Sequence, residues 1–147
     1  MSFLKDLYQE VILDHSKSPR NFSELSDANR TADGYNPLCG DKVTVFLKLK
    51  DDVVEDVSFT GAGCAISTAS ASLMTQSVKG KTLLEAKELF RRFQDLVTSG
   101  TAEGAELGEL EAFLGVSQFP VRVKCATLVW HTMQAALKNG EESVSTE

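Results

Sequence analysis

Hydrophobic residues near the start of the chain recur every three or four positions. They fall at Leu4, Leu7, Tyr8, Val11 and Ile12. On a helix these positions share one face, so the pattern predicts an amphipathic helix that ends before Pro19, because proline cannot continue a helix. The polar residues 16–35 that follow are expected to form an ordered surface loop.

Residues 42–59 instead alternate with a period of two. The two alternating runs are Val43, Val45, Leu47 and Leu49, and then Val53, Glu55, Val57 and Phe59. This alternation is typical of strands with one buried face, and the acidic pair at 51–52 between the runs suits a turn. We therefore predict an antiparallel hairpin that ends at the glycines of 61–63.

Helical spacing returns after the hairpin. Gly80 closes a second helix, and the sequence TLLE at 82–85 is a capping box that begins a third. The glycine- and glutamate-rich residues 100–115 are expected to form a loop with a short helical piece near 109–114, and Pro120 suits the first turn of a last helix. The residues expected to face inward are Ile66, Ala69, Ser70, Leu73, Met74, Ala86, Phe90, Phe93, Val97, Leu128 or Val129, Met133 and Leu137.

These elements predict a small α+β fold. We expect a small antiparallel sheet, made of the hairpin plus a short strand, that helices cover on one face, with an N-terminal helix and a long C-terminal helix. The length of 147 residues suits one core, so we expect a single domain over residues 1–140 and a disordered tail over 141–147.

Charge and composition argue against some classes of function. The net charge of −6 and the pI of about 5.0 argue against a nucleic-acid partner, whose binding usually needs a basic face, but they allow a basic protein partner. No apolar run approaches the roughly 18 residues of a membrane span, and the first residues are amphipathic rather than signal-like. We therefore expect a cytoplasmic protein without a membrane partner.

The three cysteines, Cys39, Cys64 and Cys125, are the candidate chemistry. An odd number cannot pair completely within one chain, so they are either inert buried thiols or a site that needs thiolates. The number of cysteines alone favours inert thiols, but their positions in the chain favour a functional site. Cys39 falls in a loop before the first predicted strand, Cys64 at the start of a helix, and Cys125 in the first turns of the last helix, where a helix N-terminus favours the thiolate.

Asp41 stands two residues after Cys39, with only Gly40 between them. Asp41 either caps a turn, or the bend at Gly40 directs the thiol and the carboxylate to one centre. With Cys64 and Cys125 the second alternative becomes a Cys₃Asp tetrahedron. Such a donor set suits Zn²⁺, and thiolates also suit iron–sulfur chemistry.

Four other residues are weaker candidates. His15 is expected to cap or pack the first helix, and His131, six residues after Cys125, is turned away from that thiol on a helix. Arg122 and Lys124 have two open roles. They are either solvated on the first turns of the helix, or they stabilise thiolates or a persulfide.

Several motifs together carry a resemblance to a known family. They are DH(x)3PRN at 14–21, NPLCGD at 36–41, GAGCAIS at 61–67 with ASASLM at 69–74, and RVKCAT at 122–127. With these motifs the chain resembles the IscU-like iron–sulfur cluster assembly proteins, from the first helix to about Asn139. It is most similar to the SufU-type branch, because Lys124 stands where the scaffold branch has a histidine, and residues 100–119 look like that branch's insertion.

The resemblance implies a function and a set of site residues. It implies zinc held by Cys39, Asp41, Cys64 and Cys125, with Cys39 as the acceptor of persulfide sulfur. It also implies a SufS-type cysteine desulfurase as donor and downstream iron–sulfur assembly proteins as recipients. The chain would then be a zinc-dependent sulfurtransferase.

Two alternatives remain. The chain is a non-enzymatic scaffold that carries a transient [2Fe–2S] cluster on Cys39, Cys64 and Cys125, or it is a binding module whose zinc is purely structural.

Overall fold

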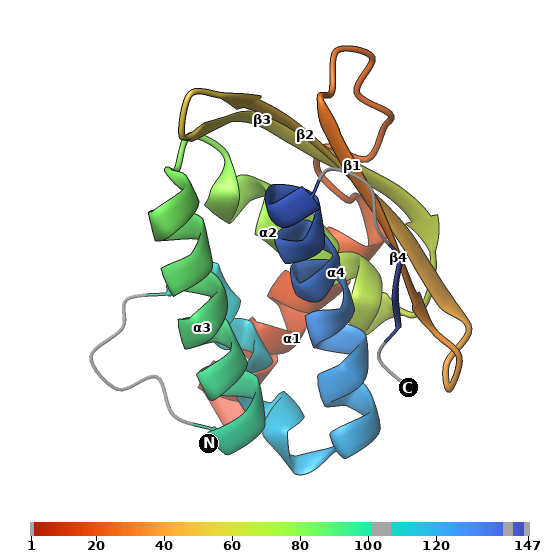
Figure 1. The fold of residues 1–147 in the computed structure, drawn as a ribbon. Helices are drawn as coiled ribbons and strands as arrows, with labels where there is room; N and C mark the ends of the chain where they lie inside the picture. The colour runs from red at the N-terminus through yellow and green to blue at the C-terminus, as the bar shows by residue number, and fades with distance from the viewer. Residues whose placement is uncertain (1, 101–106, 140–142, 146–147) are drawn as a thin grey trace.

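The computed structural model describes residues 2–100, 107–139 and 143–145 and has the α+β architecture that the sequence predicts (Figure 1). Its elements in chain order are α1 (Ser2–Lys17), β1 (Arg30–Asn36), β2 (Asp41–Lys50), β3 (Val53–Ala62), α2 (Ala65–Val78), α3 (Leu83–Ser99), the 3₁₀ helix η1 (Gly108–Gln118), α4 (Pro120–Asn139) and β4 (Ser143–Ser145). No helix in these described ranges is long and apolar enough to cross a membrane.

The sheet has the strand order β3-β2-β1-β4. The antiparallel pairing of β2 with β3 confirms the predicted hairpin, and β1, which pairs antiparallel with β2, is the short third strand. The prediction of a loop over residues 16–35 is therefore wrong from Arg30 onward, and also at residues 16–17, which belong to α1. The pattern missed β1 because a glycine, Gly34, holds one of its buried positions, where a side chain would collide with Thr132 Oγ1 of α4.

Two further details depart from the sequence prediction. Glu55 is the extra residue of a bulge, because Lys48 pairs with Asp56 and Leu49 with Val54, so the buried residue of this part of β3 is Val54 rather than Val53. The tail was expected to be disordered, but Ser143–Ser145 form the short strand β4, parallel to β1. The other residues of 141–147 lie outside the described ranges.

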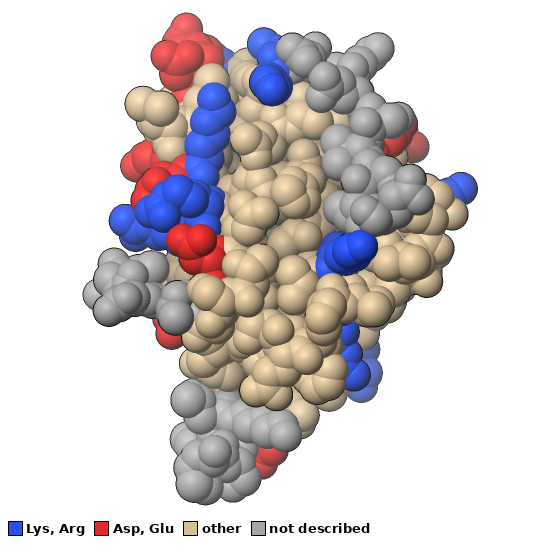
Figure 2. Space-filling view, turned by 60° about the horizontal axis from the view of Figure 1, so that its bottom comes forward, with Lys and Arg blue, Asp and Glu red and all other residues tan. Residues whose placement is uncertain are grey.

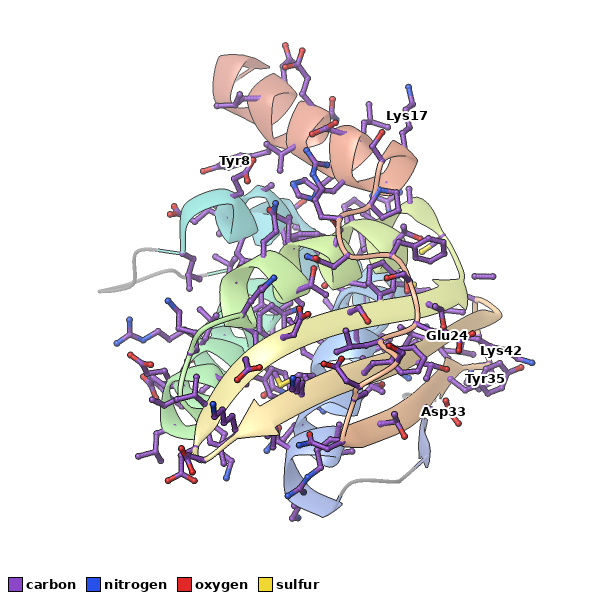
Figure 3. All side chains as sticks on the ribbon, turned by 90° about the horizontal axis from the view of Figure 1, so that it is seen from above. Tyr8, Lys17, Glu24, Asp33, Tyr35 and Lys42 are labelled. Carbon is purple, nitrogen blue, oxygen red and sulfur yellow. The ribbon has the colours of Figure 1, made fainter. Side chains whose placement is uncertain are left out.

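The helices form two layers on one side of the sheet. Helix α4 packs against β1 and β2, α2 packs against β3 and α4, and α1 lies on the far side of α2 from the sheet (Figure 3). The core between them is aromatic: Trp130 stacks on Phe93, with ring centroids 4.8 Å apart. The hydrophobic residues at the centre of the described core are Val45, Leu47, Val57, Leu73, Met74, Phe93, Leu96, Phe113, Leu128, Trp130 and Met133.

The helix boundaries largely follow the sequence signals. The capping box at Thr82 and Glu85 is present, and Gly100 ends α3 in the left-handed conformation. Two details differ from the prediction. Leu7, which was expected on the hydrophobic face of the first helix, is 46% exposed, and the short helical piece expected near 109–114 is the longer η1. Residues 101–106 of the predicted loop lie outside the described ranges.

Candidate metal centre

Three separate elements meet where the β1–β2 turn approaches α2 and α4. The turn carries Cys39, and Asp41 begins β2 directly opposite Asn36 of β1. Between them Gly40 has a φ of 72°, a left-handed conformation that glycine adopts without strain. Cys64 is the N-cap of α2, and Cys125 lies in the second turn of α4.

The side chains of these residues converge. The ligand atoms of Cys39, Asp41 and Cys125 all lie within 4.8 Å of one another, and the sulfurs of Cys39 and Cys125 are 3.2 Å apart. Cys64 stands beside this group, with its Sγ 3.9 Å from Asp41 Oδ2, although it is not within 4.8 Å of all three. The structure therefore brings together all four residues that the sequence singled out.

Asp41 is fully buried, and one of its oxygens is already occupied. Its Oδ1 accepts the backbone N–H of Cys64 at 2.9 Å, so the carboxylate is anchored at the start of α2. Gly63 leaves room for this arrangement, because a Cβ there would lie 2.6 Å from Asp41 Oδ1. The other oxygen, Oδ2, faces the sulfur of Cys64. Asp41 is therefore more than a turn residue: it also links β2 to α2.

The electrostatics of the centre favour a bound cation. Burial raises the pKa of the Cys125 thiol, and the neighbouring Cys39, Asp41 and Cys64 raise it further. Three thiolates and a carboxylate this close would repel one another without a positive charge between them. Sulfur with one oxygen is a donor set that Zn²⁺ accepts, usually with four ligands in a tetrahedron, so these residues fit that ion.

Asn36 is a residue of this centre that sequence reasoning did not assign. It is fully buried, and its side-chain amide Nδ2 lies 3.7 Å from Cys125 Sγ. Its place in the NPLCGD motif was visible in the sequence, but its contact with a residue 89 positions away depends on the tertiary fold.

The two histidines lie elsewhere. His15 is buried, and its Nδ1 is 2.7 Å from Ser72 Oγ on α2, which fits the predicted packing role. Burial is the main cause of its lowered pKa. The ring of His131 makes a T-shaped contact with Phe90, with ring centroids 5.0 Å apart, and burial lowers the pKa of His131 as well. Neither belongs to the cluster of candidate ligands found among the described residues.

The basic residues before Cys125 take different positions. The guanidinium of Arg122 stacks over the Phe119 ring, 4.4 Å from its centroid, whereas Lys124 is half-buried. Arg122 also lines a groove of about 780 Å³ between α1, η1 and the start of α4. Tyr8 enters this groove from α1 (Figure 3). The structure places neither basic side chain in the cluster of candidate ligands.

One face of the molecule is poor in charge. Figure 2 turns the bottom of Figure 1 forward and shows a broad area without charged side chains, with most acidic and basic groups at its edge. Exposed hydrophobic side chains lie close in sequence to two candidate ligands: Leu38 precedes Cys39, and Phe119 and Val121 flank the start of α4. Such a surface is suited to protein contact.

Comparison with known proteins gives consistent matches over nearly the whole chain. The sequence model of the NifU-like N terminal domain matches residues 7–143. The chain is 44% identical over 145 residues to the zinc-dependent sulfurtransferase SufU of Bacillus subtilis (strain 168), covering 96% of this chain and 98% of that protein. It is 43% identical over 140 residues to the iron–sulfur cluster assembly scaffold protein IscU of Streptococcus pyogenes serotype M1, covering 94% and 87%.

The fold has a counterpart among solved structures. The N-terminal part of a nitrogen-fixing NifU-like protein from Brucella abortus superposes with a TM-score of 0.82 at 25% identity, covering 93% of this chain and 96% of that chain.

Proposed function

Because this chain belongs to the family of NifU-like N-terminal domains, with SufU- and IscU-type iron–sulfur cluster assembly proteins as relatives, we propose that it accepts sulfur from a cysteine desulfurase and passes it on for cluster assembly. The proposal places this work in the cytoplasm, where thiols stay reduced. The observation that carries it is the convergence of Cys39, Asp41 and Cys125, with Cys64 beside them.

Cys39 is the proposed sulfur acceptor. Its side chain is exposed on a turn next to Gly40, whereas Cys125 is 2% exposed inside α4. Cys64 is exposed too, but its sulfur accepts the N–H of Ser67 as the N-cap of α2. Of the three sulfurs, only that of Cys39 can be withdrawn from the centre without disturbing a helix.

The proposed reaction is a thiol–disulfide type exchange. The Cys39 thiolate attacks the outer sulfur of the desulfurase persulfide. A sulfur–sulfur bond forms to Cys39, the old sulfur–sulfur bond breaks, and the desulfurase cysteine leaves as a thiolate. A downstream assembly protein then takes the sulfur by the same exchange. When bound, Zn²⁺ holds the three thiolates as anions and lowers their nucleophilicity.

The surroundings of the centre support this assignment. The proposed apolar contacts for the desulfurase are the exposed Leu38, which precedes Cys39, and the exposed Phe119 and Val121 at the start of α4. We assign Arg122 and Lys124 to stabilising the negative charge of the transferring sulfur. Both lie within three residues of Cys125 on the first turns of α4, and both carry a positive charge.

The second candidate function is a scaffold on which a [2Fe–2S] cluster is built by the same four residues. It is favoured by the 43% identity to the streptococcal scaffold protein. Two observations favour sulfur transfer instead. The match to the zinc-dependent sulfurtransferase covers more of both chains, and Lys124 stands where the scaffold branch has a histidine.

Metal analysis of the isolated protein, followed by mass spectrometry after exposure to desulfurase and cysteine, separates these functions. A colourless protein with one zinc per chain and a persulfide on Cys39 supports sulfur transfer. A brown protein that absorbs visible light supports the scaffold. A zinc protein that neither gains a persulfide nor raises desulfurase turnover has structural zinc only.

A further inference from the structure

Asn36 joins two parts of the metal centre that are far apart in sequence. Its Nδ2 donates to Cys125 Sγ at 3.7 Å, across to α4. On the other side its Oδ1 accepts the backbone N–H of Leu38 at 3.2 Å, and its backbone carbonyl accepts the N–H of Cys39 at 3.3 Å. A single residue thus contacts both the turn that presents Cys39 and the helix that holds Cys125.

We infer that Asn36 is a positioning residue of the metal centre, which holds Cys125 as the retained ligand and shapes the turn that presents Cys39. Partners of this kind orient metal ligands and tune their donor strength. The backbone of Asn36 adds a further constraint, because it pairs with Asp41 across the sheet.

The contact is selective among the sulfurs. The side-chain amide N–H of Asn36 donates to the buried Cys125, whereas its side-chain oxygen and its backbone carbonyl accept main-chain N–H groups of the turn. Asn36 therefore holds the backbone of Cys39 and not its sulfur, which lies 3.2 Å from Cys125 Sγ. This asymmetry explains how one centre combines a retained thiolate with a releasable one.

Another asparagine of the same sheet gives a matched comparison. Asn29 immediately precedes β1, and its side chain also makes two hydrogen bonds, accepting the N–H and donating to the carbonyl of Leu49, both at 2.8 Å. It closes the opposite end of the strand, away from the candidate ligands. Asn29 is exposed whereas Asn36 is fully buried, so Asn29 controls for the loss of side-chain hydrogen bonds at one end of β1.

The experiment compares Asn36→Ser with Asn29→Ser. A serine hydroxyl can still accept the N–H two residues later, as Asn36 Oδ1 does, but it is too short to reach Cys125. We expect Asn36→Ser to lower Zn²⁺ affinity roughly 10- to 100-fold in competition with a chromogenic chelator. In the Co²⁺-loaded protein the sulfur-to-metal charge-transfer band should move to lower energy, because the sulfur loses a hydrogen bond. Asn29→Ser should change the melting temperature alone.

The inference rests on the metal binding that the proposed function includes. Different experimental results would overturn the proposed function and the inference. A wild-type protein that binds no Zn²⁺ overturns the proposed function. If the wild type binds Zn²⁺ and a folded Asn36→Ser matches its affinity and Co²⁺ spectrum, only the inference is overturned.

If Asn36→Ser does not fold, NMR of the wild-type protein loaded with cadmium-113 tests whether the Asn36 amide is bonded to a metal-bound sulfur. Scalar coupling between the metal and the side-chain amide protons of Asn36, transmitted through the sulfur, supports the inference. If these protons show no coupling and their chemical shifts do not change when the metal binds, the inference is overturned.

Discussion

The β1–β2 turn and the two helix starts contribute to the same centre from very different surroundings. Cys39 is exposed on the turn, beside a glycine whose φ of 72° is left-handed. Cys125 is 2% exposed inside α4 and receives the amide of Asn36. Cys64 caps α2, and its backbone N–H holds Asp41. One side of the centre is therefore attached to a turn, and the other is built into the helical layer.

This difference teaches that one set of ligands can serve both stability and reactivity. A ligand in the helical layer cannot move without disturbing packed residues, so its loss should affect the metal and the fold together. A ligand on an exposed turn can be exchanged while the rest of the centre stays in place. Each prediction below tests that division.

Cys39→Ser should have the largest effect on sulfur transfer and a small one on folding. The variant lacks the proposed acceptor thiol, so mass spectrometry after incubation with desulfurase and cysteine should find no persulfide. Because Cys39 is exposed, the variant should fold and still bind the desulfurase in a pull-down assay. Persulfide found mainly on Cys64 or Cys125 of the unmodified protein, or full sulfur transfer by Cys39→Ser, would assign the acceptor elsewhere.

Cys125→Ser should lose zinc and stability first, with sulfur transfer lost as a consequence. The sulfur it removes is buried between Asn36 and Cys39, and the remaining ligands cannot close around the ion. Cys64→Ser should act in the same direction. Metal analysis and a melting curve for each variant are the measurement. If Cys125→Ser keeps full zinc occupancy and melts like the wild type, the proposal that helix ligands hold the metal and the fold more firmly than the turn ligand is wrong.

Stripping zinc from the wild type should lower its melting temperature clearly, because the ligands come from three separate elements and binding favours the folded chain. At free zinc 1,000-fold above the dissociation constant the stabilisation is about 4 kcal/mol, which corresponds to a shift on the order of 10 °C for a domain of this size. The melting curve is compared before and after chelation, with metal analysis to verify removal. An unchanged curve after verified removal contradicts the stabilising role of the metal.

Asp41→Ala should leave an open coordination position and weaken zinc binding by roughly 10-fold or more, which chelator competition measures. It also removes the acceptor of the Cys64 N–H, so both sides of the centre are affected. In a scaffold the same change should instead stabilise a bound cluster, since a labile oxygen ligand is gone. Unchanged zinc affinity would make Asp41 a turn residue only.

The sequence predicted the elements whose residues repeat with a clear period. The capping box at Thr82 and the inward face of α3 follow local rules, and the structure reproduces them. A short third strand was predicted, but its position at β1 was not, because the buried positions of β1 include Gly34 and Asn36, which serve close approach and hydrogen bonding rather than hydrophobic packing.

The candidate ligands were visible because cysteine is rare in this chain and each one falls at the end of an element. The contact of Asn36 with Cys125 was not visible, since it joins β1 to α4 and depends on how the sheet meets that helix. Local patterns therefore singled out the candidate ligands, and only the tertiary structure showed the contact between Asn36 and Cys125.

Gly63→Ala should give the smallest effect and the finest test of the comparison. The new Cβ would lie 2.6 Å from Asp41 Oδ1, so the carboxylate must shift away from the Cys64 N–H. Losing one such hydrogen bond costs about 1 kcal/mol, so zinc affinity should fall by a factor of about five. Gly115→Ala is the matched control, because a Cβ at that exposed glycine meets no atom within 4 Å. Chelator competition on both variants measures the difference. If both bind zinc equally well, the anchoring of Asp41 at the start of α2 does not contribute to metal binding.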